Sequence, residues 1–188
     1  AAYRFVSTRK GDYTVKNEVS EFEFAGDNTV IGSYVKFNRK GTGNAIEKQY
    51  YNSFENAYFV EPLKKMDPER LMFLPLLVEV DDKKVCITES DLMSYPGMYL
   101  YNSNGDTALE SNFAPYPDKV TQGGHNMLQG EVQTRKPYIA EVSGPRSFPW
   151  RICIVADNDA ELLDDDMVFR LSQPNAIGDT SWIKPGKV

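Results

Sequence analysis

Short apolar runs separated by turn residues recur along the whole chain. The clearest alternation is E-F-E-F at 21–24, where every second residue is apolar, a pattern typical of a strand with one buried face. The stretch at 150–156 is mainly apolar and predicts the strongest strand. On these criteria we expect strands at 3–6, 15–24, 29–31, 34–37, 72–80, 85–87, 98–100, 109–113, 129–134, 138–142, 150–156 and 167–171.

Helical periodicity is weak by comparison, because no stretch keeps apolar residues at a spacing of 3.6. We expect at most a turn or two of helix at 66–71, with Asp67 as cap and Pro68 in the first helical position. One further turn is expected at 160–163, after a polar cap at 157–159. The segment at 72–80 is either one central strand with an irregularity at Pro75 or two short strands. The pattern therefore predicts an all-β protein, an antiparallel sandwich or barrel.

Composition narrows the class of protein. A length of 188 residues suits one domain with a sizeable core. The formal charge of −6 and the pI of about 4.9 argue against non-specific binding to nucleic acid, which needs a basic surface. There is no long uncharged apolar run, so we expect no membrane span. The chain shows no signal-peptide pattern and no initiator methionine, and it stops just after Pro185-Gly186, so we interpret it as part of a longer protein.

The two cysteines, Cys86 and Cys153, both lie in apolar, strand-like runs. We favour two buried free thiols, because two cysteines alone do not make a disulfide framework. A disulfide between them stays open for an oxidising compartment.

Three motifs, in the same order along the chain, resemble the N-terminal domain of glycoside hydrolase family 97. The first joins I-T-E-S-D-L at 87–92 to Y-P-G-M-Y-L at 95–100. The second is F-P-W-R at 148–151 leading into I-V-A-D-N at 154–158, and the third is D-T-S-W-I-K-P-G-K at 179–187. Weaker similarity lies at 112–115 and 175–177, and the match extends from residue 3 to the last residue.

The resemblance implies a fold and a function. The fold would be a β-supersandwich similar to galactose mutarotase, of which this chain would form part, with a sandwich domain at 1–180 and the start of a linker to a catalytic barrel at 181–188. The chain would be the non-catalytic N-terminal domain of a calcium-dependent α-glucosidase or α-galactosidase. It would pack on the barrel, lend a loop to the site that binds α-linked oligosaccharides, and belong to a periplasmic or secreted protein. The catalytic carboxylates of that family lie on the barrel, so we expect no glycosidase activity from this chain alone.

The residue that the resemblance singles out is Glu89, which matches the glutamate with which the family's N-terminal domain binds calcium. Calcium takes six to eight oxygen ligands, and one carboxylate supplies at most two. We therefore expect Glu89 to be exposed here, at the end of a strand, and to bind calcium weakly or not at all by itself. From the residues alone, a solvated or capping carboxylate is the more ordinary interpretation. Asp91 is the next residue to test for the metal role, and it also fits a cap on the following turn.

A second function class is a self-standing carbohydrate-binding module. Aromatic side chains crowd the polar stretch at 46–60, and rings stack well on sugar C–H faces. Such rings more often close the edge of a core, which we favour here. The candidates are Tyr50, Tyr51, Phe54 and Tyr58.

The other polar clusters give ordinary interpretations. The acidic run at 164–166 lacks the spacing of a calcium loop and is expected to be a solvated turn, as is 157–159. The single histidine, His125, is expected to be a solvated loop residue, because one histidine does not make a multi-histidine metal site.

Overall fold

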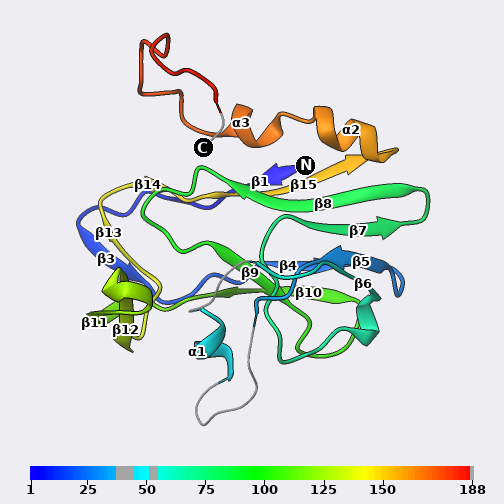
Figure 1. Ribbon diagram of the computed structural model, residues 1–188, viewed down its shortest axis with the longest axis horizontal. Coiled ribbons are helices and arrows are strands. Elements are labelled where there is room, and N and C mark those ends of the chain that lie inside the picture. The colour runs from blue at the N-terminus through cyan, green and yellow to red at the C-terminus, as the bar shows by residue number, and fades with distance from the viewer. Residues whose placement is uncertain (37–44, 51–54, 187–188) are drawn as a thin grey trace.

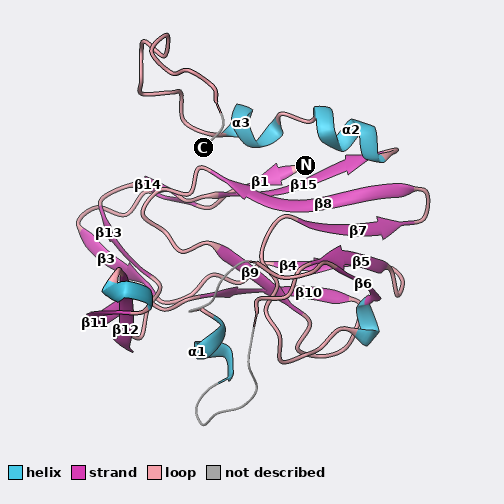
Figure 2. Ribbon diagram, in the orientation of Figure 1, coloured by secondary structure: helices cyan, strands magenta, loops and turns pink. Residues whose placement is uncertain are grey.

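The computed structural model describes residues 1–36, 45–50 and 55–186, and it shows two antiparallel sheets packed face to face beneath a thin layer of helix (Figures 1 and 2). The larger sheet has six strands in the order β1-β15-β8-β7-β5-β6. Their bounds are β1 Ala2–Tyr3, β5 Thr29–Gly32, β6 Phe59–Pro62, β7 Leu76–Val80, β8 Lys83–Ser90 and β15 Trp150–Ala156.

A three-stranded sheet in the order β4-β10-β9 faces the larger one. Its strands are β4 Glu21–Glu23, β10 Ala108–Phe113 and β9 Met98–Tyr101. Both sheets direct apolar side chains to a common core, where Val78 and Ile87 of the larger sheet join Leu100 and Leu109 of the smaller, all fully buried. Burial of this shared core is what holds the two sheets together. The predicted all-β sandwich is confirmed.

Within the described residues, three two-stranded ribbons and three short helices complete the fold. The ribbons are β3 Asp12–Val15 with β13 Ala140–Ser143, β2 Val6–Ser7 with β14 Arg146–Ser147, and β11 Pro117–Gly123 with β12 Gln129–Arg135. The helices are α1 Ala45–Gln49, α2 Asp159–Asp164 and α3 Met167–Leu171, with 3₁₀ turns η1 at Leu63–Lys65 and η2 at His125–Met127. No helix among the described residues approaches the length of about 20 apolar residues that a membrane crossing requires.

Most of the predicted strands are present, with shifts at their ends. Two differ further: the strand predicted at 15–24 is interrupted between β3 and β4, and the described part of 34–37 has only an isolated bridge at Tyr34. The strand at 150–156 is confirmed and lies next to β8 in the larger sheet. At 72–80 the regular strand begins only after Pro75, while Met72 makes isolated bridges to Tyr34 and Leu100, so one short strand and a bridge stand in place of the two short strands or the single strand considered. The helix predicted at 66–71 is not formed: a 3₁₀ turn lies earlier, at Leu63–Lys65, and Asp67 closes a local turn by accepting a 3.1 Å hydrogen bond from the Glu69 N–H.

The strand predicted at 167–171 is wrong, because this segment is helix α3. A run of five residues, M-V-F-R-L, has no alternation that separates strand from helix. Local polar groups stabilise the helix. Asp165 accepts a 2.9 Å hydrogen bond from the Met167 N–H, and Arg170 forms an ion pair with Asp166 one turn earlier. The helix lies on the outer face of the larger sheet, where Ser90 donates a 2.5 Å bond to the Val168 carbonyl.

Strand β11 is not among the predicted strands, and it begins with Pro117, a residue that disfavours strand interiors. Proline is tolerated here at the first position of a strand in a two-stranded ribbon, beside a register shift that accommodates it. The predicted helical turn at 160–163 is present as α2, capped by Asn158, which accepts a 3.2 Å bond from the Glu161 N–H.

Candidate functional site

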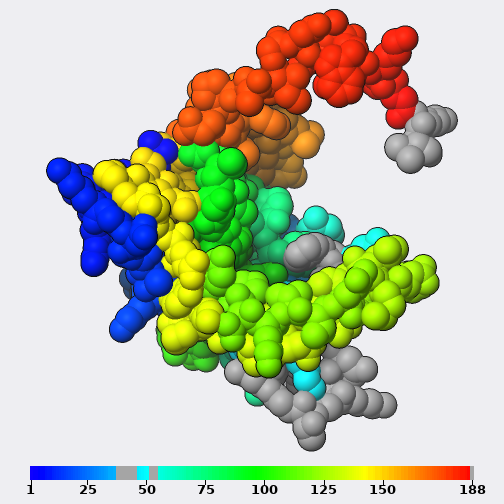
Figure 3. All heavy atoms as spheres, turned by 90° about the vertical axis from the view of Figure 1, so that its left-hand side faces the viewer, coloured from blue at the N-terminus to red at the C-terminus, as the bar shows by residue number. Residues whose placement is uncertain are grey.

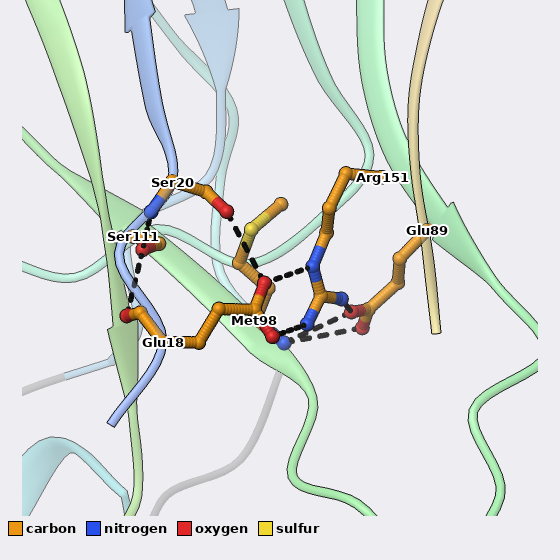
Figure 4. Close-up of polar contacts among 6 residues, drawn as sticks. All are labelled: Glu18, Ser20, Glu89, Met98, Ser111 and Arg151. Atoms are coloured by element: carbon orange, nitrogen blue, oxygen red, sulfur yellow. Dashed lines mark hydrogen bonds and ion pairs between the residues drawn. The ribbon is translucent and has the colours of Figure 1, made fainter. Parts of the chain in front are cut away.

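Two neighbouring strands place Glu89 and Arg151 directly opposite each other. In the antiparallel register of β8 and β15, Arg151 faces Glu89, and directly opposite residues project to the same face of a sheet. The Arg151 side chain has no exposed surface and lies 5.1 Å from the Phe113 ring centroid, so this face is the one that meets the smaller sheet. The pair therefore lies in the space between the two sheets (Figure 4).

The second carboxylate comes from the segment between β3 and β4. Glu18 accepts two hydrogen bonds from Arg151, from Nε at 2.7 Å and from Nη2 at 2.9 Å. Ser20 donates a further bond of 3.1 Å to Glu18. A bidentate pair of this kind fixes the plane of the guanidinium as well as its position. Its third nitrogen, Nη1, is thereby directed at Glu89 Oε2, which it contacts at 2.6 Å (Figure 4).

The Glu89 carboxylate is held on its other side by the backbone of the 95–100 motif. The Met98 N–H donates to both carboxylate oxygens, at 3.2 and 3.1 Å. A Cβ on Gly97 would lie 3.3 Å from Glu89 Oε1, so the carboxylate sits close against this glycine. The same carboxylate lines a cavity of about 580 Å³ together with Phe73, Leu74, Pro96, Gly97, Met98, Tyr99 and Ala114.

The prediction that Glu89 is exposed is therefore wrong, because only 15% of its side chain is accessible. Its position at a strand end is confirmed, one residue before β8 ends. The local sequence around Glu89 carries no sign of burial, since the group that neutralises it lies 62 residues further along the chain. Only the pairing of β8 with β15 brings the two together.

Burial sets the electrostatics of the cluster. Desolvation raises the pKa of the Glu89 carboxyl above its usual range, and the charge of Glu18 adds to this, while Arg151 and the Met98 N–H oppose it. Two carboxylates share one guanidinium, so the fully ionised cluster carries one net negative charge. An added cation beside Glu89 would balance that charge.

The described residues by themselves do not form a complete calcium site. They include no group of three or more His, Cys, Asp or Glu side chains placed to hold a metal ion. Glu89 fits the role of one ligand, because it is a hard oxygen donor at the wall of a cavity inside a negatively charged cluster. The remaining ligands of a shell of six to eight would have to come from elsewhere.

Asp91 does not join this site. It follows the end of β8 with a positive φ of 60°, which takes it out of the strand. Its carboxylate lies 3.6 Å from Arg4 and accepts a 3.3 Å bond from Gln173. These contacts tie the β8 end to the N-terminal segment and to the chain after α3.

Among the described residues, the aromatic side chains considered for sugar binding do not form an exposed surface on which a sugar could stack. Tyr50 packs 5.8 Å from the Tyr99 ring, and its hydroxyl donates to Asn112. Burial, followed by the charge of Glu47, raises the pKa of Tyr50 to about 12. Tyr58 is 71% exposed, and Tyr51 and Phe54 lie outside the described residues. The interpretation of Tyr50 as a ring at the edge of the core is confirmed.

The remaining predictions concern single side chains. Cys86 and Cys153 are free, and they lie on opposite faces of the larger sheet because Cys86 pairs with Ile154 and Cys153 with Ile87. His125 is exposed in the turn between β11 and β12. The acidic residues at 157–159 and 164–166 surround the ends of α2 and α3, as ordinary capping and solvated groups.

Glu18 and Arg151 are the site residues that sequence reasoning missed. Arg151 stood inside the motif at 148–151, but nothing local distinguished it from a solvated arginine. A charged residue near the start of the strongest predicted strand was the available signal, because such a residue is rarely buried without a partner.

Comparisons with known proteins agree with this architecture. The family described as "Glycosyl-hydrolase 97 N-terminal" matches residues 1–174. A retaining alpha-galactosidase from Bacteroides thetaiotaomicron is 48% identical over 188 residues, which are 100% of this chain and 28% of that protein. Among solved structures, a glycoside hydrolase family 97 enzyme from Pseudoalteromonas sp. strain K8 in complex with acarbose has a TM-score of 0.69 at 20% identity, over 98% of this chain and 24% of that one. A variant of that enzyme in complex with panose matches equally well.

Proposed function

The chain belongs to the N-terminal domain family of glycoside hydrolase family 97, and we propose that it is the non-catalytic N-terminal domain of a calcium-dependent α-glycosidase. In this proposal it packs on a catalytic barrel of the same polypeptide and supplies Glu89 as one ligand of a calcium ion at the substrate site. The observation that carries the proposal is the orientation of Glu89, which is fixed by Arg151 and Met98 at the wall of an open cavity.

The protein's own contribution is to position this carboxylate and to pair its charge. Arg151, held by Glu18, favours the ionised form of Glu89, and the Met98 N–H holds the carboxylate against Gly97. A ligand held in place before the metal arrives loses little conformational freedom on binding. Bound calcium would act as an electrostatic anchor for oxygen atoms of the substrate.

We propose an α-galactoside as the substrate class. The relative at 48% identity is a retaining alpha-galactosidase, whereas the enzyme seen with acarbose and panose is 20% identical. The chain spans 28% of the length of that relative, so the groups that recognise the sugar are expected in the part of the protein beyond this chain.

The alternative, a self-standing carbohydrate-binding module, has less support. It requires exposed aromatic faces, and Tyr50 is packed against Tyr99 with its hydroxyl bonded to Asn112. Tyr58 alone among the described candidates presents an exposed ring.

The experiment is calcium titration of the intact enzyme by calorimetry, with Glu89→Gln and Asp91→Asn as matched variants. Glu89→Gln keeps the shape of the side chain and removes its charge, so we expect calcium affinity to fall at least tenfold and hydrolysis of an aryl α-galactoside to slow. Asp91→Asn should leave both unchanged, because Asp91 contacts Arg4 and Gln173 instead. Unchanged calcium affinity in Glu89→Gln would refute the metal role of Glu89. A loss of affinity in Asp91→Asn alone would assign that role to Asp91.

A further inference from the structure

The ribbon of β11 and β12 forms an arm that stands apart from both sheets. Its two strands of seven residues pair only with each other in the described sheet topology, and β11 is exposed at every residue except Gly123. A seven-residue strand spans roughly 20 Å, and Figure 3 shows the arm projecting from the body of the protein. A two-stranded ribbon alone in water is marginally stable, so such an arm gains from a surface to pack on.

The base of the arm is firmly anchored. Tyr116 donates to the Tyr138 carbonyl and the Lys136 N–H donates to the Tyr116 carbonyl, both at 2.8 Å. Arg135 pairs with Glu47 of α1 at 2.5 Å and donates to the Pro115 carbonyl at 2.7 Å. These contacts fix the direction in which the arm leaves the domain.

The tip is built from its own residues and presents apolar side chains. Gly124 has a φ of +68° and its N–H donates to Glu131 at 2.8 Å, while a Cβ on Gly123 would come within 2.6 Å of the same carboxylate. This tight turn leaves Met127 and Leu128 57% and 80% exposed. Met127 also has a φ of +57°, a conformation that costs energy in a residue with a side chain.

The strands behind the tip add one more exposed apolar side chain. Val120 pairs with Val132 across the ribbon, and Val120 is 53% exposed. The arm carries no net charge, since Asp118 and Glu131 balance Lys119 and Arg135, whereas the whole chain carries −6. An uncharged arm with an apolar tip suits a protein surface better than it suits nucleic acid or an ionic ligand.

We propose that this arm docks on the catalytic domain of the same polypeptide, with Met127 and Leu128 in an apolar depression of that domain. The inference rests on the proposed function and deepens it. The base of the arm lies next to the proposed metal site, because Ala114, three residues before β11, lines the cavity that holds Glu89. The retaining alpha-galactosidase continues well beyond the 28% that this chain matches, which leaves a large partner surface within one polypeptide. Because the arm begins next to the proposed calcium site, it lies close to the catalytic domain that would supply the other calcium ligands.

The test is photo-crosslinking in the intact enzyme, with p-benzoylphenylalanine at position 128 and, separately, at 127. The control position is Asp82, in the β7–β8 turn at the opposite end of the molecule from the arm in Figure 1. Equal amounts of unlabelled and ¹⁵N-labelled enzyme are mixed before irradiation. We expect crosslinks from positions 127 and 128 to peptides beyond residue 188, at several times the level seen from position 82. Both peptides of each crosslink should carry the same isotope label, because the contact is within one polypeptide.

Two results would overturn the proposal. Mixed-label crosslinks would show that the arm contacts a second copy, and crosslinking no higher than at position 82 would show that it stands in solvent. Calcium affinity of the same crosslinker-bearing enzymes is measured in parallel. Because Glu89→Gln reports on the metal role independently of the arm, failure of the docking proposal and failure of the proposed function are distinguishable.

Discussion

Arg151 Nη1 donates a 2.6 Å hydrogen bond to Glu89 Oε2 from the directly opposite position on the neighbouring strand. The same guanidinium binds Glu18 through its other two nitrogens, so one buried cation ties the larger sheet to the segment before β4. A buried charge is costly unless it is paired, and here every nitrogen of the guanidinium has a carboxylate partner. The cluster thus couples stability of the sandwich to the placement of Glu89.

Removing Arg151 should destabilise the fold strongly. Arg151→Leu leaves Glu18 and Glu89 without their cation, and breaking a buried pair typically costs about 3–5 kcal/mol. Urea unfolding followed by tryptophan fluorescence measures the change. Arg170→Leu is the matched control, because that side chain is 73% exposed and should shift stability by no more than about 0.5 kcal/mol. Equal stability of Arg151→Leu and the wild type would show that the cluster contributes nothing net to the fold.

Gly32 should tolerate no side chain. A Cβ at this position would overlap Leu76 Cδ1 and lie 3.3 Å from the Phe59 ring, inside the larger sheet. Overpacking a well-filled core costs about 1–3 kcal/mol, which we expect for Gly32→Ala in the same unfolding assay. Gly178→Ala serves as the comparison, because no atom lies within 4 Å of the added methyl group. A neutral Gly32→Ala would mean that Leu76 repacks freely.

The sequence predicted the sandwich but only half of its site. Alternation and turn residues are local, so the strands at 85–87, 109–113 and 150–156 were predictable. The cluster depends on register between strands 62 residues apart, which no local pattern encodes. The same limit explains helix α3, whose five apolar-rich residues fit either structure until Asp165 and Asp166 supply local partners. Glu89 was singled out by family resemblance alone, and its burial was missed.

Tyr34 should make the fold sensitive to alkali. Burial, opposed in part by the Asp67 N–H, raises the pKa of Tyr34 from 10.0 to about 12. Below pH 10 the hydroxyl is protonated in both the folded and the unfolded chain, so its contribution is fully present. Between pH 10 and 12 the unfolded chain ionises first, which removes up to about 2.7 kcal/mol. Tyr34→Phe should show a correspondingly shallower loss of unfolding free energy over this range, and an unchanged slope would contradict the assignment.

The isolated chain should hydrolyse no glycoside. Glycosidases place two carboxyl groups on either side of the scissile bond, about 5 to 10 Å apart, with room for the sugar between them. Glu18 and Glu89 instead form ion pairs with the fully buried Arg151. The Arg151 side chain therefore occupies the space between the two carboxylates where a substrate would have to lie. Aryl α-galactosides and α-glucosides incubated with residues 1–188 should therefore release phenol at the rate of the enzyme-free blank. Turnover that disappears in Glu18→Gln or in Glu89→Gln would place catalytic chemistry in this domain.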